Sequence, residues 1–200
     1  SAIEEQSSMD FGLLKYSPSG NLLWASSWDG PANGMDIPAD LDIDQEGSIY
    51  LVGGTESLNT FSDYAIVKFD ANGGYLWHNT YDYANLHDAA TSIAIHSNNI
   101  VVSGASASAF NSWDYATLIM DKSDGTINDV KRTVVSGVGL DNVVAVTSDA
   151  NNNTYITGYV EINGNRNIQT LKINGNFDLE WVKNFDGGLE DVGRAIGVDE

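Results

Sequence analysis

Apolar and polar residues alternate over short stretches along the whole chain, which is the pattern of half-buried β-strands. The stretch at residues 63–77, DYAIVKFDANGGYLW, predicts a strand, a tight turn at Asn72-Gly73 and a second strand that ends at Trp77. No stretch sustains an apolar pattern with a period of 3.6 residues, so no long helix is predicted. The sequence therefore predicts an all-β protein.

The hairpin pattern recurs at a nearly constant spacing. Its copies begin at Asp10, Asp63, Asp114 and Asn167, which are 51–53 residues apart. A second pattern, two short strands joined by a polar turn, follows the hairpins and begins at Asp36, Asp88, Asp141 and Asp191. Self-similarity at a fixed period of this size indicates a repeat architecture.

Each repeat unit holds four short strands separated by turns rich in Gly, Asn and Asp. Four antiparallel strands in a unit of this length are typical of a β-propeller blade. A stacked β-helix would have shorter rungs, and an immunoglobulin array would need about 100 residues per unit. We therefore predict four-stranded antiparallel β-propeller blades of 51–53 residues each.

The spacing of several residue types resembles the seven-bladed β-propeller repeat family (SBBP repeats) and, more distantly, the NHL and PQQ-type propellers. The residues that carry the resemblance are the pairs Asp10-Phe11, Asp63-Tyr64 and Asp114-Tyr115, then Lys15, Lys68 and Lys172, then Trp24, Trp77 and Trp181, then Trp28-Asp29, Tyr81-Asp82 and Phe185-Asp186, and finally Gly53, Gly104 and Gly158. The third hairpin departs from the pattern, with Ile119 in place of the Lys and Asn128 in place of the Trp. The resemblance implies that the strands beginning at Asp36, Asp88, Asp141 and Asp191 are innermost, along a central channel, and that the hairpins are outermost.

This interpretation divides the chain into a tail at residues 1–9 and propeller repeats at 10–200. The repeats comprise an outer hairpin at 10–28, three blades at about 36–83, 88–135 and 141–186, and an inner strand at 191–199. These parts are four units less one strand. The favoured explanation is a window from a larger ring of six to eight blades. The alternative is a four-unit chain that closes on itself or pairs with a second copy through exposed blade edges, which are prone to association.

The inner strand of the first unit differs from the others in the residues that flank its large apolar position. Counting from the opening Asp, the fifth residue on is always large and apolar, and we expect it to fill one face between blades; these residues are Leu41, Ile93, Val146 and Ile196. The residues on either side of it are small in most units, which would allow close approach of the neighbouring sheet, but the first unit has Asp40 and Asp42 there. The face that carries these carboxylates is therefore expected either to be solvated or to have a functional role.

Asp40, Asp42 and Asp44 are the candidate metal ligands, because alternating carboxylates before a Gly resemble the first half of a calcium loop. Gly47 and Leu51 do not fit the rest of such a loop. Alternate residues of a strand also lie about 7 Å apart, which is wide for one ion. Solvated strand and turn acids are the competing interpretation. Calcium is the one cofactor considered.

The other recurring residues favour structural roles. The four Asp residues that open the inner strands are expected to accept hydrogen bonds at blade corners, and the recurrent Trp residues are expected to lie in the core between blades. His78, His87 and His96 have no metal-ligand spacing, so an edge or loop role is expected. No nucleophile elbow, Walker loop or dinucleotide fingerprint is present, and no catalytic residue is predicted.

The amino-acid composition limits the classes of molecule that the protein is expected to bind. The chain has 9 basic and 28 acidic residues and a formal net charge of −19, which disfavours nucleic acid and anionic membranes as partners. Cations, basic proteins and neutral glycans are compatible with this charge. The absence of Cys excludes disulfides and thiolate metal sites. No apolar run is long enough for a spanning helix, and membrane insertion is not expected.

The sequence thus predicts a non-catalytic binding or scaffolding module of a secreted or cell-surface protein, with a protein or glycan ligand. The first alternative is a propeller enzyme domain of the quinoprotein or lyase kind, which family resemblance alone permits. The second is a self-associating half-propeller that a second chain completes.

Overall fold

The computed structural model describes residues 9–58, 61–109, 112–133 and 139–199. Within these ranges the regular elements are all β-strands, fourteen in number. They form one two-stranded and three four-stranded antiparallel sheets. The all-β prediction is confirmed.

The first sheet contains β1 (Phe11–Tyr16) and β2 (Leu22–Trp28). The second contains β3 (Asp36–Ile43), β4 (Ile49–Glu56), β5 (Ser62–Phe69) and β6 (Tyr75–Tyr81). The third contains β7 (Asp88–Ile95), β8 (Asn99–Ala109), β9 (Ser112–Asp121) and β10 (Ile127–Thr133). The fourth contains β11 (Asn142–Ser148), β12 (Thr154–Ile162), β13 (Asn165–Ile173) and β14 (Leu179–Phe185).

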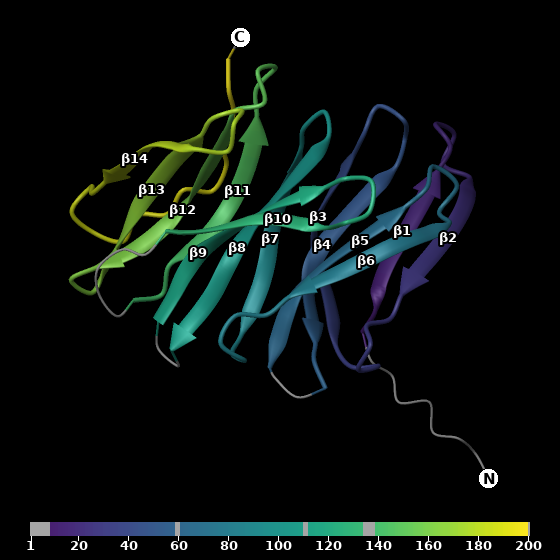
Figure 1. Cartoon of the computed structure of the whole chain (residues 1–200), viewed down its shortest axis with the longest axis horizontal. Coiled ribbons are helices and arrows are strands. Elements are labelled where there is room, and N and C mark those ends of the chain that lie inside the picture. Colours follow the sequence, from purple (N-terminus) through teal and green to yellow (C-terminus); the bar gives the residue numbers. More distant parts are fainter. Residues whose placement is uncertain (1–8, 59–60, 110–111, 134–138, 200) are drawn as a thin grey trace.

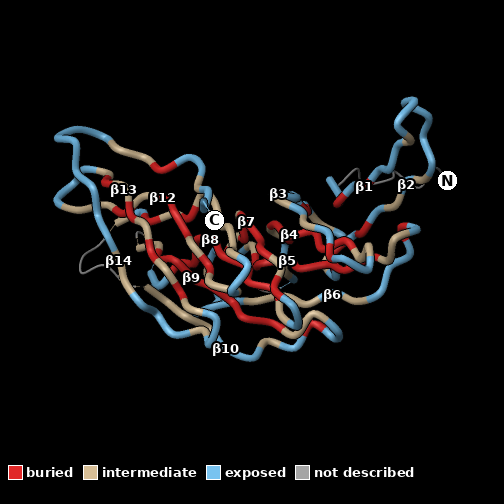
Figure 2. Tube along the Cα trace, turned by 90° about the horizontal axis from the view of Figure 1, so that it is seen from above, coloured by how far each residue is buried: buried red, intermediate tan, exposed pale blue. Residues whose placement is uncertain are grey.

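In every sheet, strands that follow one another in the chain are neighbours, so each sheet is a simple meander. The sheets follow one another side by side (Figure 1). Seen from above they form an arc, in which β3 and β7 lie on the concave side and β6, β10 and β14 on the convex side (Figure 2). The first strand of a four-stranded unit is thus the inner one.

Residues 191–199 were expected to form a further inner strand, but they carry no strand assignment. The segment is held by single backbone hydrogen bonds, from Asp191 N to Arg166 O (2.7 Å) and from Gly193 N to Gly158 O (3.2 Å). A strand needs a ladder of hydrogen bonds to a neighbour, and within the described residues no strand is paired with this segment in such a ladder. Residues 1–8 of the predicted tail and residues 134–135 of the second predicted blade lie outside the described residues.

The hydrophobic core lies between the sheets rather than inside any one of them. One cluster joins the first and second sheets, a second joins the second and third, and a third joins the third and fourth. The middle strands β4, β5, β8 and β9 are therefore buried on both faces; residues 63–69 of β5 are all buried. This explains why those strands read as continuous apolar runs rather than as strict alternation.

One contact repeats between successive sheets. The aromatic residue near the start of the third strand of a unit (β1, β5 or β9) reaches the Gly of the second strand in the next unit. The three pairs are Phe11 with Gly53, Tyr64 with Gly104 and Tyr115 with Gly158. A Cβ on each Gly would collide with the aromatic ring or hydroxyl and with a carbonyl of the neighbouring inner strand. The recurring aromatic and the recurring Gly are thus two halves of one packing contact.

The face of β3 that points toward the first sheet is open. Leu41 was expected to fill a space between sheets, yet it is 45% exposed, and Ile43 on the same face is more than half exposed. Its equivalent in the next unit, Ile93, is only 4% exposed. The reason is that β3 and β4 cover β7, whereas the first sheet has only β1 and β2, which cover β4 and β5. We call Leu41 and Ile43 the open face of β3.

The carboxylates of β3 point the opposite way, toward β7. The Asp40 carboxylate accepts hydrogen bonds from Ser92 Oγ (2.8 Å) and Ile93 N (3.1 Å). Of the two alternatives expected for the carboxylate-bearing face, solvation or a functional role, solvation is therefore not observed, since Asp40 and Asp42 are half-buried. The solvated face of β3 is the apolar one, because burial depends on which strands lie alongside and not on residue type.

Candidate functional site

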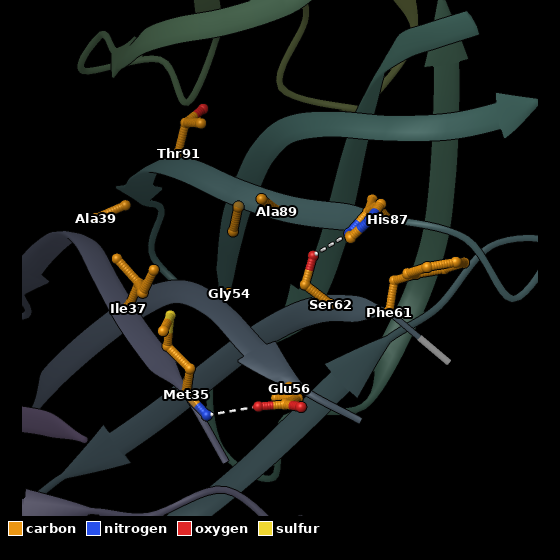
Figure 3. Close-up of a pocket in the computed structure, with 11 residues that line it drawn as sticks. Met35, Ile37, Ala39, Gly54, Glu56, Phe61, Ser62, His87, Ala89 and Thr91 are labelled. Atoms are coloured by element: carbon orange, nitrogen blue, oxygen red, sulfur yellow. Dashed lines mark hydrogen bonds between the residues drawn. The ribbon is translucent and has the colours of Figure 1, made fainter. Parts of the chain in front are cut away.

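A mainly apolar cavity of about 560 Å³ opens between β3 and β7 (Figure 3). Its wall is formed by residues before and along β3, by the end of β4, by the start of β5 and by the beginning of β7. The lining residues are Met35, Ile37, Ala39, Gly54, Glu56, Phe61, Ser62, His87, Ala89, Ala90 and Thr91. We call it the β3–β7 pocket.

Small residues create this pocket. Ala39 occupies the position that Thr91 has in the next unit, and the Thr91 hydroxyl donates to Val143 O (3.0 Å), which ties β7 to β11. Ala39 has no hydroxyl, so it makes no such link between β3 and β7. The equivalent space between β7 and β11 is only about 250 Å³, and Trp113 and Tyr159 line it. The pocket is therefore a local departure from the repeat.

The rim of the pocket is polar and aromatic. Ser62 Oγ is hydrogen-bonded to His87 Nδ1 (3.1 Å), and the Phe61 ring lies 4.4 Å from the His87 ring between centroids. The His87 ring also stacks on Trp113, with 6.0 Å between centroids. The Glu56 carboxylate accepts a hydrogen bond from Met35 N (3.0 Å) (Figure 3). An apolar wall with a few polar groups at the rim is the usual form of a recognition site.

The pair of Ser62 and His87 raises the question of nucleophilic catalysis. A Ser–His pair needs a third group that orients the imidazole and stabilises its charge. Within the described part of the chain, no carboxylate is hydrogen-bonded to His87. What the arrangement offers chemically is a hydrogen-bonding edge beside an apolar wall.

The predicted ligands Asp40, Asp42 and Asp44 each engage different neighbours. Burial raises the pKa of Asp42, with smaller opposing effects from backbone hydrogen bonds of Ile43 and Ile95. Burial also raises the pKa of Asp44, but hydrogen bonds from Ser48 N (2.8 Å) and the Tyr50 hydroxyl (3.0 Å) bring it below its ordinary value.

The oxygens of these three residues do not form one of the described groups in which three carboxylates lie within 4.8 Å of one another. Asp42 and Asp44 instead line a polar cavity of about 620 Å³ at the turn end of the inner strands, together with Lys122 and Asp149. Calcium binding at Asp40, Asp42 and Asp44 remains a hypothesis without a gathered set of ligands.

His96 is placed differently from the other two histidines. His78 and His87 are exposed, as an edge or loop role requires. His96 lies in the turn between β7 and β8, as a loop role requires, but it is buried there. Its ring stacks on Phe177 and is hydrogen-bonded through Nε2 to Thr154 Oγ1 (2.9 Å). Burial lowers the pKa of His96, which therefore acts as a neutral core residue.

The aspartates that open the inner strands accept hydrogen bonds at corners, as predicted. The Asp36 carboxylate accepts from Gly30 N (2.6 Å) and Thr55 Oγ1 (2.5 Å). The others accept from backbone amides: Asp88 from Tyr83 N (2.8 Å), Asp141 from Glu161 N (2.8 Å) and Asp191 from Gly187 N (2.6 Å).

The recurrent tryptophans also follow the prediction where their packing is described. Trp24 lies against the turn at Gly73 in the next sheet, and Trp77 lies against the turn at Gly125 in the sheet after that. Both rings pack on the core clusters between sheets.

Sequence reasoning did not find the β3–β7 pocket. Its walls come from two different units, and its residues are mostly small or apolar ones that carry no chemical motif. The available signal was the difference between units at one position, Ala39 against Thr91, in a chain that otherwise repeats closely.

Comparison with models of known protein families gave no match, and no curated protein matches the sequence. Among the described residues, the structure has no helix that is long and apolar enough to cross a lipid bilayer.

Proposed function

We propose that the chain is an open array of β-propeller blades that serves as a non-catalytic binding or scaffolding module of a secreted or cell-surface protein. The meander order of each sheet and the inner position of β3 and β7 support the propeller interpretation. The residue spacing that resembles SBBP repeats supports it independently. The acidic surface suits a protein that works in solution outside the cell.

The observation that carries the binding role is the β3–β7 pocket. Its volume of about 560 Å³ lies in the range of sites that hold small molecules or large side chains. The alanines and Ile37 offer an apolar wall, and the Glu56 carboxylate at the rim favours a neutral or cationic partner over an anion. The best candidate ligand is a large apolar side chain of a partner protein, flanked by neutral or basic groups.

A neutral naphthylamine dye, N-phenylnaphthylamine, tests for this pocket because its fluorescence rises in apolar surroundings. We expect saturable binding to the unaltered chain. Ala39→Trp should abolish it, since Ala39 is exposed and a Trp there would fill the pocket. Leu41→Ser, on the same strand but outside the pocket, is the control and should keep it. Equal binding by all three proteins, or loss only with Leu41→Ser, would contradict the proposal.

A second candidate function, self-association, is favoured by the open face of β3. Two apolar side chains, Leu41 and Ile43, are exposed there, while the equivalent face of β7 is covered by the preceding sheet. A second chain laid on this face would bury both side chains, each worth about 1.5–3 kcal/mol when fully buried.

Light scattering tests self-association. We expect a mass that rises with concentration toward twice the chain mass of 21.5 kDa, and the single chain mass for Leu41→Asp with Ile43→Asp. A monomer at all concentrations would exclude this function without affecting the pocket.

A further inference from the structure

Carboxylates from three separate strands or loops meet at a corner of the second sheet. Asp63 begins the buried run of β5, Asp82 follows β6, and Asp88 opens β7. One oxygen from each lies within 4.8 Å of the other two. The same grouping occurs one unit earlier, with Asp10, Asp29 and Asp36.

Asp88 is the residue that points to a ligand. Its side chain is fully buried, at 0% exposure. Oδ2 accepts the hydrogen bond from Tyr83 N (2.8 Å), but Oδ1 has no hydrogen-bond partner. Leaving a buried carboxylate oxygen without a partner is costly, and native proteins rarely tolerate it. A buried, unpartnered oxygen beside two further carboxylates is what a bound cation would satisfy.

We propose that Asp63, Asp82 and Asp88 bind a calcium-type divalent cation, and that Asp10, Asp29 and Asp36 form an equivalent site. Hard cations prefer oxygen ligands, and Ca²⁺ accepts them at about 2.3–2.6 Å in flexible arrangements. Two oxygens bound to one Ca²⁺ can therefore lie up to about 5 Å apart, which the spacing in both groups satisfies. The ion would tie the start of one inner strand to the outer strands of the unit before it.

Arg132 is the rival source of positive charge near Asp88. Its guanidinium donates to Asp114 Oδ2 (3.1 Å) and to Ser106 O (3.1 Å), and it lies 3.8 Å over the Tyr83 ring. It is thus engaged elsewhere and does not satisfy Asp88 Oδ1.

The other units supply internal controls. In the third unit Thr133 stands where the middle carboxylate would be, between Asp114 and Asp141 in the chain. In the fourth unit Asn167 replaces the first carboxylate, while Asp186 and Asp191 are kept. Neither set is among the three-carboxylate groups of the described residues. The proposal therefore predicts two ions per chain and not four.

Calorimetric titration of the chelator-treated full chain with Ca²⁺ tests this. We expect two ions per chain and a melting temperature that rises with added Ca²⁺. Asp82→Asn should remove one ion and Asp29→Asn the other, each weakening that site by more than about tenfold. Both residues are exposed, so their Asn variants should fold, which circular dichroism would verify.

The matched control is Asp186→Asn, the equivalent change in the unit that has Asn167, and it should leave both ions bound. Absence of Ca²⁺ binding to the unaltered chain would overturn the proposal. So would binding that Asp186→Asn weakens as much as Asp82→Asn does, since that result would mean diffuse attraction to an acidic surface. This experiment is independent of the pocket and of self-association.

Discussion

At the scale of single residues, the repeat is best explained by contacts that join one sheet to the next. Tyr64 reaches over Gly104, and Lys68 extends to the next sheet, where its ammonium donates to Lys122 O (2.8 Å). Lys15 makes the corresponding bond to Ala71 O (3.1 Å). These residues recur because the same junction recurs, and not because each copy is a separate active site.

The Gly104 contact leads to the first prediction. Gly104→Ala would place a Cβ against Ala89 O and the Tyr64 hydroxyl, and we expect a loss of about 1–3 kcal/mol in the free energy of unfolding. Gly12→Ala is the control, because a Cβ there meets nothing within 4 Å. Urea denaturation of both variants measures the difference. Equal stability of the two variants would refute the packing role of Gly104.

Asp141 gives a prediction about pH. Burial, with added repulsion from Asp114 and Glu161, raises its pKa from the ordinary value of 3.8 to about 6. The folded chain therefore holds this proton more tightly than the unfolded chain, so its contribution to stability is present below about pH 4 and is lost as pH rises through about 6. We expect Asp141→Asn to remove that loss, which amounts to at most about 3 kcal/mol for a shift of about two pH units.

Denaturation of both proteins at pH 4.5 and pH 7 measures this effect. Relative to the unaltered chain, Asp141→Asn should gain clearly more stability at pH 7 than at pH 4.5. The Asn side chain can still accept the hydrogen bond from Glu161 N, so the comparison isolates the charge. A stability difference between the two proteins that does not change with pH would contradict the assignment.

At the scale of strands and sheets, two tyrosines in equivalent positions differ in one bond. The buried Tyr64 hydroxyl donates to Ala116 O (3.0 Å) in the next sheet, whereas the buried Tyr115 hydroxyl has no partner. Tyr64→Phe should cost about 1 kcal/mol or more, because it removes a buried hydrogen bond. Tyr115→Phe should be neutral or stabilising, because it removes an unsatisfied group. The reverse order in thermal or chemical denaturation would show that these hydroxyls do not act as described.

The existence and order of the strands could be predicted from the sequence, because turn residues and the repeat period mark them. The hairpin read at residues 63–77 is observed as β5 and β6, with Lys68 opposite Trp77 in the register. The burial of each face could not be predicted in the same way. An alternating pattern predicts burial correctly only for a strand with one solvent-exposed face. Both faces of β5 are covered by neighbouring sheets, so even Lys68 is buried.

The candidate site was less predictable than the fold, for a physical reason. Leu41 and Ile93 have the same place in the pattern, and only the presence or absence of a covering sheet decides which one is exposed. The pocket likewise depends on Ala39 and Ala89, small residues from two units that carry no chemistry of their own. The corner carboxylates are spread over 26 residues of sequence, from position 63 to 88, which hid their convergence.

At the scale of the whole molecule, the arc of sheets is open at β3. The inner strand β7 follows a sheet that contains the inner hairpin β3–β4, and β11 follows a sheet that contains the inner hairpin β7–β8. The sheet before β3 contains only β1 and β2 and has no inner hairpin. If the sheets are propeller blades, the open face of β3 is where the inner hairpin of another unit belongs. The open face and the arc are then consequences of one architecture.

The most direct test of this architecture completes the first sheet. In the extended chain, residues 1–8 are replaced by a second copy of residues 88–112, the segment that contains the inner hairpin β7–β8, joined directly to Met9. The equivalence of Met9 and Trp113 in the repeat sets this junction. In the added copy, Ser92 stands at the repeat position that Asp40 has in β3. The added strand would therefore bring no second carboxylate next to Asp40.

The measurement is the relaxation of the Leu41 and Ile43 methyl groups by a soluble nitroxide, recorded on monomeric protein, with the buried Ile93 methyl groups as reference. In the unaltered chain we predict strong relaxation of both residues. In the extended chain we predict protection close to that of Ile93, because the added hairpin covers the open face. Equally strong relaxation in the two chains would contradict the propeller account.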